Sequence, residues 1–422
     1  MTFPDDFWWG AGMSATTAEG AAPASDLAAW EQAGRCRPSG PGAGFFERFV
    51  DDLALLAERG LCHLRLTLEW ARLEPTNGRR DDEAVDHLRS VLRAAGDAGI
   101  TVWGCLHDGT LPGWFAHDER GFADARSRRY FWARHVELVG EAFGDLVGGW
   151  VPVHEPGRWA QRGWIDGARP PGRRDDAEGF AAALEGVHLA SVDAAQRLRQ
   201  SGQPVATAQW LVPVFGWRAD PDAPVSAEAE VATGIVDEAF WGSWRRMLTE
   251  ETLVVGHRPP VEVPGAREAF DVIGFTYRHA ATVRGDGALG PYPQRSATGA
   301  DGQVAWSEGL ALALHHMAES LPGRPLLVAG YGLTTGDEDH RERYLRDGLA
   351  IAADAVADGI DLRGFWWDAP VGSAPDGSGG PNGEGAGAGG EGAGAGLFAR
   401  DRTPRPAAAL LSSVTHGGAV PA

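Results

Sequence analysis

Three acidic residues stand where short apolar segments of the sequence end, and they are the first candidates for chemistry. Glu155 follows the apolar run that starts at residue 149, Asp108 follows the run from residue 101, and Asp368 closes the run from residue 362. His154 directly precedes Glu155, and an imidazole can exchange protons near neutral pH. Carboxylates and imidazoles are the usual general acids and bases, so these residues could move protons to and from a substrate.

Alternating strand and helix patterns run along most of the chain. Eight apolar segments are predicted as strands, at residues 8–12, 63–70, 101–108, 149–156, 205–210, 271–278, 325–332 and 362–368. Amphipathic helices are predicted at residues 45–59, 82–98, 125–143, 177–200 and 339–358. Alternating βα units imply a parallel sheet, and eight of them favour a closed (β/α)8 TIM barrel of the α/β class over an open sheet. The carboxyl ends of all eight strands would then meet at one end of the barrel.

A single domain over residues 1–422 is predicted, because a (β/α)8 barrel with insertions reaches this length. One segment breaks the alternating pattern. Residues 371–396 are rich in glycine and have too few apolar side chains to form a core, so a disordered loop is expected there. This loop would follow the eighth strand, at the end of the barrel that carries active sites.

Composition excludes several classes of function. The formal net charge is -20, which disfavours binding to nucleic acid. The chain contains no lysine, so a lysine Schiff base cannot form, and no cofactor is expected. Its three cysteines are far apart and form no metal-binding pair, so no metal is expected. No apolar run is long enough for a membrane helix, and the acidic N-terminus is unlike a signal peptide, which predicts a cytoplasmic protein.

Several motifs together resemble glycoside hydrolase family 1, the family of many β-glucosidases. FWWGAGMSATTAEG at residues 7–20 is similar to the family's opening pattern FxWGxAtSAyQiEG. LRLTLEWARLEP at 64–75 resembles yRfSisWpRilP, and WVPVHEPGRW at 150–159 resembles WitfNEPw. Further similar segments are GWIDGARPPG at 163–172, DVIGFTYR at 271–278, WSEGL at 306–310 and RGFWWD at 363–368. The resemblance implies a TIM barrel that acts on glycosides.

The resemblance also implies a role for Glu155. Family 1 enzymes retain configuration and use two glutamates, an acid/base and a nucleophile, roughly 5 Å apart. The acid/base glutamate of the NEP motif corresponds to Glu155, whose pKa burial is expected to raise. His154 replaces the motif's asparagine, which contacts the sugar 2-hydroxyl, so His154 is a predicted substrate-binding residue.

The nucleophile glutamate of the resemblance has no counterpart here. The family's iTENG motif corresponds to LLVAGYGLTT at residues 326–335, where the glutamate position is Gly330. No aspartate or glutamate occurs from residue 325 to 336, so a shift of register cannot supply one. Tyr331 is next in sequence, but neighbouring strand residues point to opposite sides. A covalent glycosyl-enzyme is therefore not expected at this position.

Other sugar-binding positions of the family are changed as well. Thr17 replaces a glutamine, Asp108 a histidine, and Arg278 the tyrosine that touches the nucleophile, while Arg65 is kept. Two arginines in a pocket need counter-charges, which Asp108, Glu69 and Asp368 or an anionic substrate could supply. The predicted substrate-binding residues are His154, Arg65, Arg278, Thr17, Trp306, Trp367 and Tyr277, and the predicted catalytic residues are Glu155, Asp108 and Asp368.

Three functions agree with this pattern. The chain could act on a glycoside-like small molecule by a non-classical mechanism, with Glu155 as general acid and Asp108 or Asp368 as base on a water molecule. It could instead be a retired glycosidase that binds a ligand or a partner without turnover. It could also carry non-glycosidic acid/base chemistry through His154, Glu155 and Asp108 in a biosynthetic pathway. In each case ordinary retaining β-glucosidase activity is expected to be weak or absent.

Overall fold

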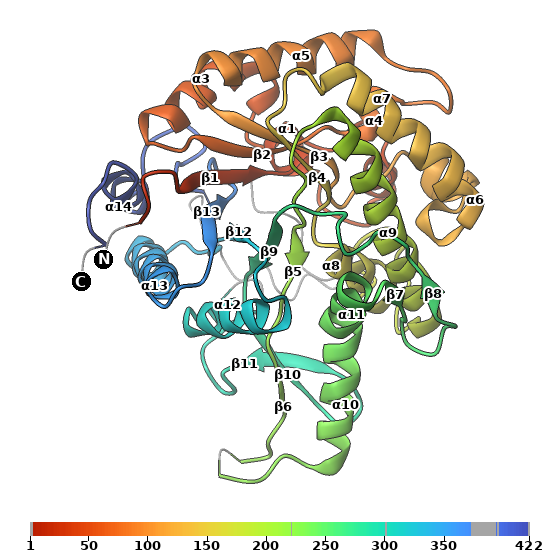
Figure 1. Cartoon of the computed structure of the whole chain (residues 1–422), viewed down its shortest axis with the longest axis vertical. Helices are drawn as coiled ribbons and strands as arrows, with labels where there is room; N and C mark the ends of the chain where they lie inside the picture. The colour runs from red at the N-terminus through yellow and green to blue at the C-terminus, as the bar shows by residue number, and fades with distance from the viewer. Residues whose placement is uncertain (1–2, 221, 300–301, 373–393, 395, 421–422) are drawn as a thin grey trace.

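The computed structural model describes residues 3–220, 222–299, 302–372, 394 and 396–420. Most of the glycine-rich segment at 371–396, for which a disordered loop is predicted, lies outside these described residues. Eight parallel strands form the central sheet, with helices arranged around it (Figure 1). In chain order these strands are β1 (Trp8–Met13), β2 (His63–Thr67), β3 (Thr101–His107), β4 (Gly149–Val153), β5 (Gln209–Trp210), β9 (Ile273–Tyr277), β12 (Leu326–Tyr331) and β13 (Leu362–Asp368).

The sheet closes into a barrel between β4 and the segment that leads into β5. The strand order is β4-β3-β2-β1-β13-β12-β9-β5, which leaves β4 and β5 at the two edges. Isolated parallel bridges pair Trp150 with Val205 and His154 with Ala208, and the Glu155 amide donates to the Ala208 carbonyl at 2.8 Å. The predicted (β/α)8 barrel is thereby confirmed.

Most of the longer helices pack around the barrel and cover its outer face, whereas α10 packs on a small separate sheet (Figure 1). The helices are α1 (Ala15–Glu19), α2 (Asp26–Gln32), α3 (Phe45–Glu58), α4 (Trp70–Leu73), α5 (Asp82–Asp97), α6 (Ala125–Ser127), α7 (Ala133–Phe143), α8 (Pro156–Ala160), α9 (Ala177–Leu198), α10 (Ala227–Asp237), α11 (Ser243–Glu250), α12 (Glu308–Ser320), α13 (Glu338–Ala357) and α14 (Pro406–Thr415). Two small sheets were not predicted: β6 (Val214–Gly216), β10 (Ala280–Val283) and β11 (Leu289–Tyr292) form one, and β7 (Thr252–Leu253) and β8 (Val261–Glu262) the other.

Two predicted strands end earlier in the structure than the apolar pattern suggested. The segment predicted as a strand to residue 70 leaves the sheet after Thr67, because the Glu69 carboxylate accepts a hydrogen bond from the Ala71 amide and caps α4. In the segment predicted to residue 156, the regular strand β4 ends at Val153 and His154 still bridges Ala208. Pro156 then occupies the first turn of α8, where its missing N–H costs nothing. Both changes turn the chain into a helix at the carboxyl end of the barrel.

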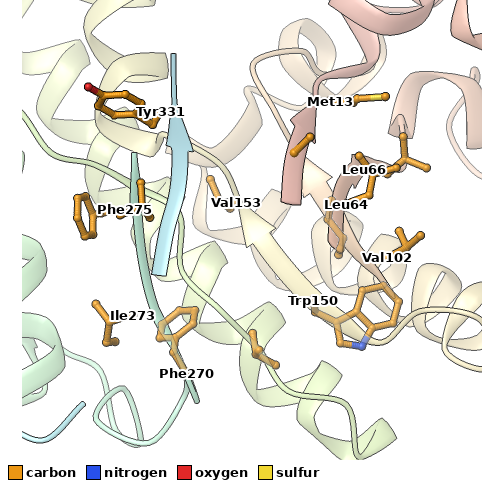
Figure 2. Close-up of a cluster of buried hydrophobic side chains, with 14 of the residues drawn as sticks. Met13, Leu64, Leu66, Val102, Trp150, Val153, Phe270, Ile273, Phe275 and Tyr331 are labelled. Carbon is orange, nitrogen blue, oxygen red and sulfur yellow. The ribbon is translucent and has the colours of Figure 1, made fainter. Parts of the chain in front are cut away.

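Alternate strand residues face two separate cores, and this alternation decides which side chains can reach the site. A small inner cluster fills the barrel and contains Trp103, Cys105, Val151, Ala206, Ala208, Val272, Leu327, Ala329 and Trp366. A large outer cluster lies between strands and helices, and Figure 2 draws part of it, including Leu64 and Leu66 of β2, Ile273 and Phe275 of β9, and Tyr331 of β12. Arg65 of β2 and Thr276 of β9 alternate with these outer residues and face the barrel axis, as does Arg278 just beyond β9.

Candidate active site

Charged side chains from five neighbouring strand ends meet at the carboxyl end of the barrel. Arg65 of β2 binds Asp108 beyond β3, with 2.6 Å between Nη1 and Oδ2, and lies 3.7 Å from Asp368 of β13. Arg278 beyond β9 binds Asp368 and also Glu155 beyond β4, with 2.7 Å between its Nε and Oε1 of Glu155. The structure therefore brings together the three predicted catalytic carboxylates and both predicted arginines.

Glu155 is held by three side chains at once. Its Oε1 accepts hydrogen bonds from Thr276 Oγ1 at 2.7 Å and from Arg278, and its Oε2 accepts one from Arg158 Nη1 at 3.0 Å. Burial raises the pKa of this carboxyl group, but Arg278 and then Arg158 outweigh burial and hold it well below its ordinary value. The expected rise in the Glu155 pKa is therefore wrong for this arrangement, in which Glu155 is a carboxylate and not an acid.

The backbone of Glu155 is also unusual. Its φ of 48° and ψ of 53° lie in the left-handed region, which non-glycine residues adopt at a cost. The preceding segment is fixed by the bond from the Glu155 amide to the Ala208 carbonyl, and the next residue, Pro156, starts α8. This turn aims the carboxylate across the barrel mouth toward β9.

Asp108 forms the second centre of the network. It accepts hydrogen bonds from Arg65 at 2.6 Å and from Thr67 Oγ1 at 3.1 Å, and its Oδ1 lies 2.9 Å from Nδ1 of His154. Burial raises its pKa, but His154 and Arg65 outweigh burial and hold it well below the ordinary value. His154 is buried, and within the described part of the chain its Nε2 has no hydrogen-bond partner. The Asp108 carboxylate therefore fixes the orientation of the buried His154 ring through Nδ1.

The charges of this network balance without a ligand. The carboxylates of Asp108, Glu155 and Asp368 face the guanidinium groups of Arg65, Arg278 and Arg158. Glu69, which was a candidate counter-charge, takes no part in these ion pairs and accepts a hydrogen bond from Thr110 Oγ1 at 2.8 Å. An anionic ligand is therefore not needed to compensate the two predicted arginines.

Gly330, the position at which the family resemblance expects the nucleophile, lies near the carboxyl end of β12. In the register of β12 and β9 it pairs with Thr276, whose hydroxyl donates to Glu155. A Cβ atom added to Gly330 would lie 2.9 Å from Thr276 Cγ2, closer than real Cβ contacts come. Tyr331 points the other way, where its hydroxyl donates to the Tyr344 carbonyl at 2.9 Å. Neither position offers a nucleophilic side chain to the network.

Four predicted substrate-binding residues lie outside the network. Tyr277 and Trp367 are fully buried in the outer cluster, because each neighbours an inward-facing residue and strands alternate sides. The Tyr277 hydroxyl donates to the Trp306 carbonyl, and the Trp306 ring packs against Phe215 and Tyr292 of the small sheet. Thr17 binds Ser14 within the first turn of α1. For Tyr277 and Trp367, contact with a substrate would require a different side-chain orientation, so this prediction is corrected.

Sequence reasoning missed two features near the site. Arg158 was not predicted, although it follows Glu155 by three residues, a spacing that brings helical side chains together. Asp26 and Glu19 are buried acids whose pKa values rise to about 7, through burial first, and neither was a candidate. The described residues contain no group of three or more potential metal ligands. None of the described helices is both long and apolar enough to cross a membrane.

A family model for glycosyl hydrolase family 1 matches residues 1–372 of this chain. The chain belongs to glycosyl hydrolase family 1. Among similar curated proteins, thermostable beta-glucosidase B of Thermobispora bispora is 25% identical over 406 residues, which cover 87% of this chain and 82% of that protein. Coniferin beta-glucosidase of Pinus contorta is 23% identical and covers 86% of this chain and 83% of its own length.

Solved structures of this family share the fold. A beta-glycosidase from Pyrococcus horikoshii superimposes with a TM-score of 0.86 at 22% identity, covering 100% of this chain and 96% of that chain. An aphid myrosinase superimposes with a TM-score of 0.82 at 14% identity, covering 99% of each chain. At such low identity these structures support the barrel fold alone. The chemistry of the site has to be argued from the residues of this chain.

Proposed function

We propose that this family 1 barrel binds a glycoside or glycoside-like molecule at its strand ends and does not hydrolyse it by the retaining mechanism. The observation that carries this proposal is the state of Glu155, an ionised carboxylate clamped between Arg278 and Arg158. A retaining glycosidase needs a protonated acid at one carboxyl group and an ionised nucleophile at the other. Glu155 is ionised, as the nucleophile of such an enzyme is, and not protonated like the acid. The position at which the family resemblance expects the nucleophile is Gly330.

The site keeps features that suit a polar ligand. The side chains of Arg278 and Arg158 are 19% and 30% exposed. Each can therefore bind Glu155 and also contact a molecule at the barrel mouth. Charged hydrogen-bonding groups on rigid strand ends are suited to hydroxyl groups of a sugar. The β-glucosidase relatives support a glycoside as the class of ligand.

Binding and hydrolysis can be separated with 4-nitrophenyl β-D-glucoside. Ligand-detected NMR should show binding to the wild-type protein and loss of binding in Glu155→Gln, while nitrophenol release stays at the level of buffer in both. Glu342→Gln is the matched control, because it removes the same charge and its ion pair with Arg346 lies on α13 away from the site. Nitrophenol release that Glu155→Gln abolishes would make the protein a glycosidase, and absence of binding across a panel of aryl glycosides would contradict the proposal.

Base-assisted chemistry is a second candidate, which the pairing of His154 with Asp108 favours. Asp108 orients the ring through Nδ1 and leaves Nε2 to take a proton from a substrate or a water molecule. If turnover of any glycoside is found, Asp108→Asn should abolish it, and proton NMR of the first sugar released should show inverted configuration. Retained configuration would exclude direct attack by water.

A further inference from the structure

A second pocket lies beside the barrel mouth and does not include any residue of the Glu155 network. It is bounded by the segment after β3, from Leu111 to Ala123, and by the segment after β4, from Trp159 to Pro171. Asp26, at the start of α2, also lines the pocket. The empty volume of the pocket, with the open solvent at its mouth included, is about 410 Å³. The ring of His107 touches both Phe122 and Trp159, with 5.2 Å between centroids in each case, and so stands between this pocket and Asp108.

Three aromatic rings form much of the wall of this pocket. Trp159 and Phe122 are buried, their centroids are 5.7 Å apart, and their planes meet at 82°. Trp164 is half-buried and lies 5.0 Å from Trp159 at 67°. Rings at such steep angles meet edge to face, and aromatic faces attract both apolar bodies and cations. The wall is therefore suited to a small apolar or ring-shaped molecule that carries positive charge.

Asp26 is the acidic group of this pocket, and only half of its carboxylate is satisfied. Its Oδ1 accepts hydrogen bonds from the Leu27 amide at 2.8 Å and the Leu111 amide at 3.1 Å. Oδ2 receives no hydrogen bond from any residue that the structure describes. Burial raises the Asp26 pKa to about 7 although both amides lower it, the charge of Glu69 raises it further, and Arg169 lowers it. A carboxylate in such surroundings gains from a cation that reaches it.

We propose that this pocket binds a small organic amine, whose ammonium group reaches Asp26 and whose apolar body packs on Phe122, Trp159 and Trp164. Arg169 acts on Asp26 through its charge, but no described residue forms an ion pair with Asp26. An ammonium group would supply that direct contact, and the rings add cation–π attraction. A sugar fits less well, because its several hydroxyl groups would meet aromatic walls with one carboxylate among them. At the rim, Arg120 is bound to Asp124 at 2.9 Å and His117 is exposed to solvent, so both are screened.

Benzylamine and benzyl alcohol test this proposal, because they share a ring and differ in charge. At pH 8, benzylamine should bind at least about tenfold more tightly than benzyl alcohol, measured by ligand-detected NMR titration. Benzylamine stays protonated between pH 6 and 8, whereas a carboxyl group with a pKa of about 7 loses its proton over that range. Benzylamine affinity should therefore fall by about tenfold from pH 8 to pH 6, and benzyl alcohol affinity should change little.

Variants separate Asp26 from the general attraction of an acidic protein for cations. Asp26→Asn should remove the pH dependence and most of the preference for benzylamine, because asparagine keeps the oxygen that accepts from Leu27 and Leu111. Asp118→Asn makes the same change in net charge on the exposed part of the loop and should leave benzylamine binding unchanged. His117→Asn removes the exposed imidazole at the rim and should keep the pH dependence.

Three outcomes would overturn the proposal. Equal affinities for benzylamine and benzyl alcohol at pH 8 would show that charge is not recognised. An equal loss in Asp118→Asn and Asp26→Asn would assign the binding to net charge, and loss of the pH dependence in His117→Asn would assign it to the rim. If Asp26→Asn fails to fold, Trp164→Ala gives a further test, since it should weaken benzylamine binding severalfold by removing a half-buried ring from the wall.

Discussion

Replacing Arg278 with methionine should destabilise the protein, and the size of the effect follows from what Arg278 touches. Its guanidinium group pairs with Glu155 and Asp368, whose side chains are 6% and 13% exposed. Removing one member of a buried ion pair typically costs 3–5 kcal/mol, because the remaining charge is left uncompensated. Glu155 would keep Arg158, and Asp368 would keep Arg65 at 3.7 Å, so we expect a loss of about 3 kcal/mol at pH 7.

The loss should depend on pH in a definite direction. Arg278 helps to hold the folded-state pKa of Glu155 below its ordinary value, so its stabilising effect is present above pH 4.5 and is lost as the pH falls through the folded-state pKa. Without Arg278, burial has more weight and the Glu155 pKa rises. The free energy of unfolding of the variant should thus lie furthest below that of the wild type at pH 7. The difference should become smaller toward pH 4, where Glu155 of the variant takes up a proton.

Urea unfolding of both proteins at pH 7 and pH 4 measures this difference, with two further variants as controls. Arg346→Met removes an ion pair on a helix surface, in which both side chains are 29% exposed, and should cost about 1 kcal/mol or less at either pH. Arg278→Met combined with Glu155→Gln should be more stable at pH 7 than Arg278→Met alone, since no charge is stranded. A loss below about 1 kcal/mol, or one equal at both pH values, would refute the argument.

Three further predictions concern other positions. Gly330→Glu should lower stability by about 1–3 kcal/mol in thermal melts, because the new side chain meets the Thr276 methyl group. Adding Thr276→Ser should recover part of this loss, because serine keeps the hydroxyl and lacks that methyl group. A double variant as unstable as Gly330→Glu alone would contradict the steric reason. Asp26→Asn should raise the free energy of unfolding by about 2–4 kcal/mol more at pH 8 than at pH 4. The folded-state pKa of Asp26, about 7, exceeds its ordinary value of 3.8, so the wild-type protein loses stability as the pH rises between these two values and the asparagine variant does not. A stability difference between variant and wild type that is the same at both pH values would contradict this. Tyr277→Phe should cost about 1 kcal/mol in urea unfolding without altering glycoside binding, and altered binding would argue against its outward orientation.

The barrel was predictable because its signals are local and repeated. Each of the eight predicted strands corresponds to a strand or bridged segment, since apolar runs separated by amphipathic helices leave few other arrangements. Strand ends were harder to predict, because they depend on single contacts such as the Glu69 cap of α4. The segment at 205–210 looked like the other strands, yet only Gln209–Trp210 forms a regular strand. The small sheet joins the β10–β11 pair to β6, which is distant in sequence, and no joint signal links β6 to that pair in the sequence.

The candidate site was predictable in its members but not in its state. Parallel strands place their carboxyl ends together, so Glu155, Asp108 and Asp368 could be grouped from strand positions alone. The pKa values of Glu155 and Asp108 depend on which positively charged group reaches which oxygen, and Arg278 turned the expected rise for Glu155 into a fall. Asp26 could not be found in the same way, because its burial arises from contact with the segment that begins at Leu111, far away in sequence.

The seam of the barrel has a consequence for how this protein could respond to stress. The peptide group that closes the ring between Glu155 and Ala208 belongs to the same residue that holds two arginines at the mouth. Breaking the hydrogen bond between Glu155 and Ala208 would move the Glu155 carboxylate away from Arg158 and Arg278. Loss of these two ion pairs would in turn make that hydrogen bond easier to break. We therefore expect the ion pairs at the barrel mouth and this end of the seam to lose their order together.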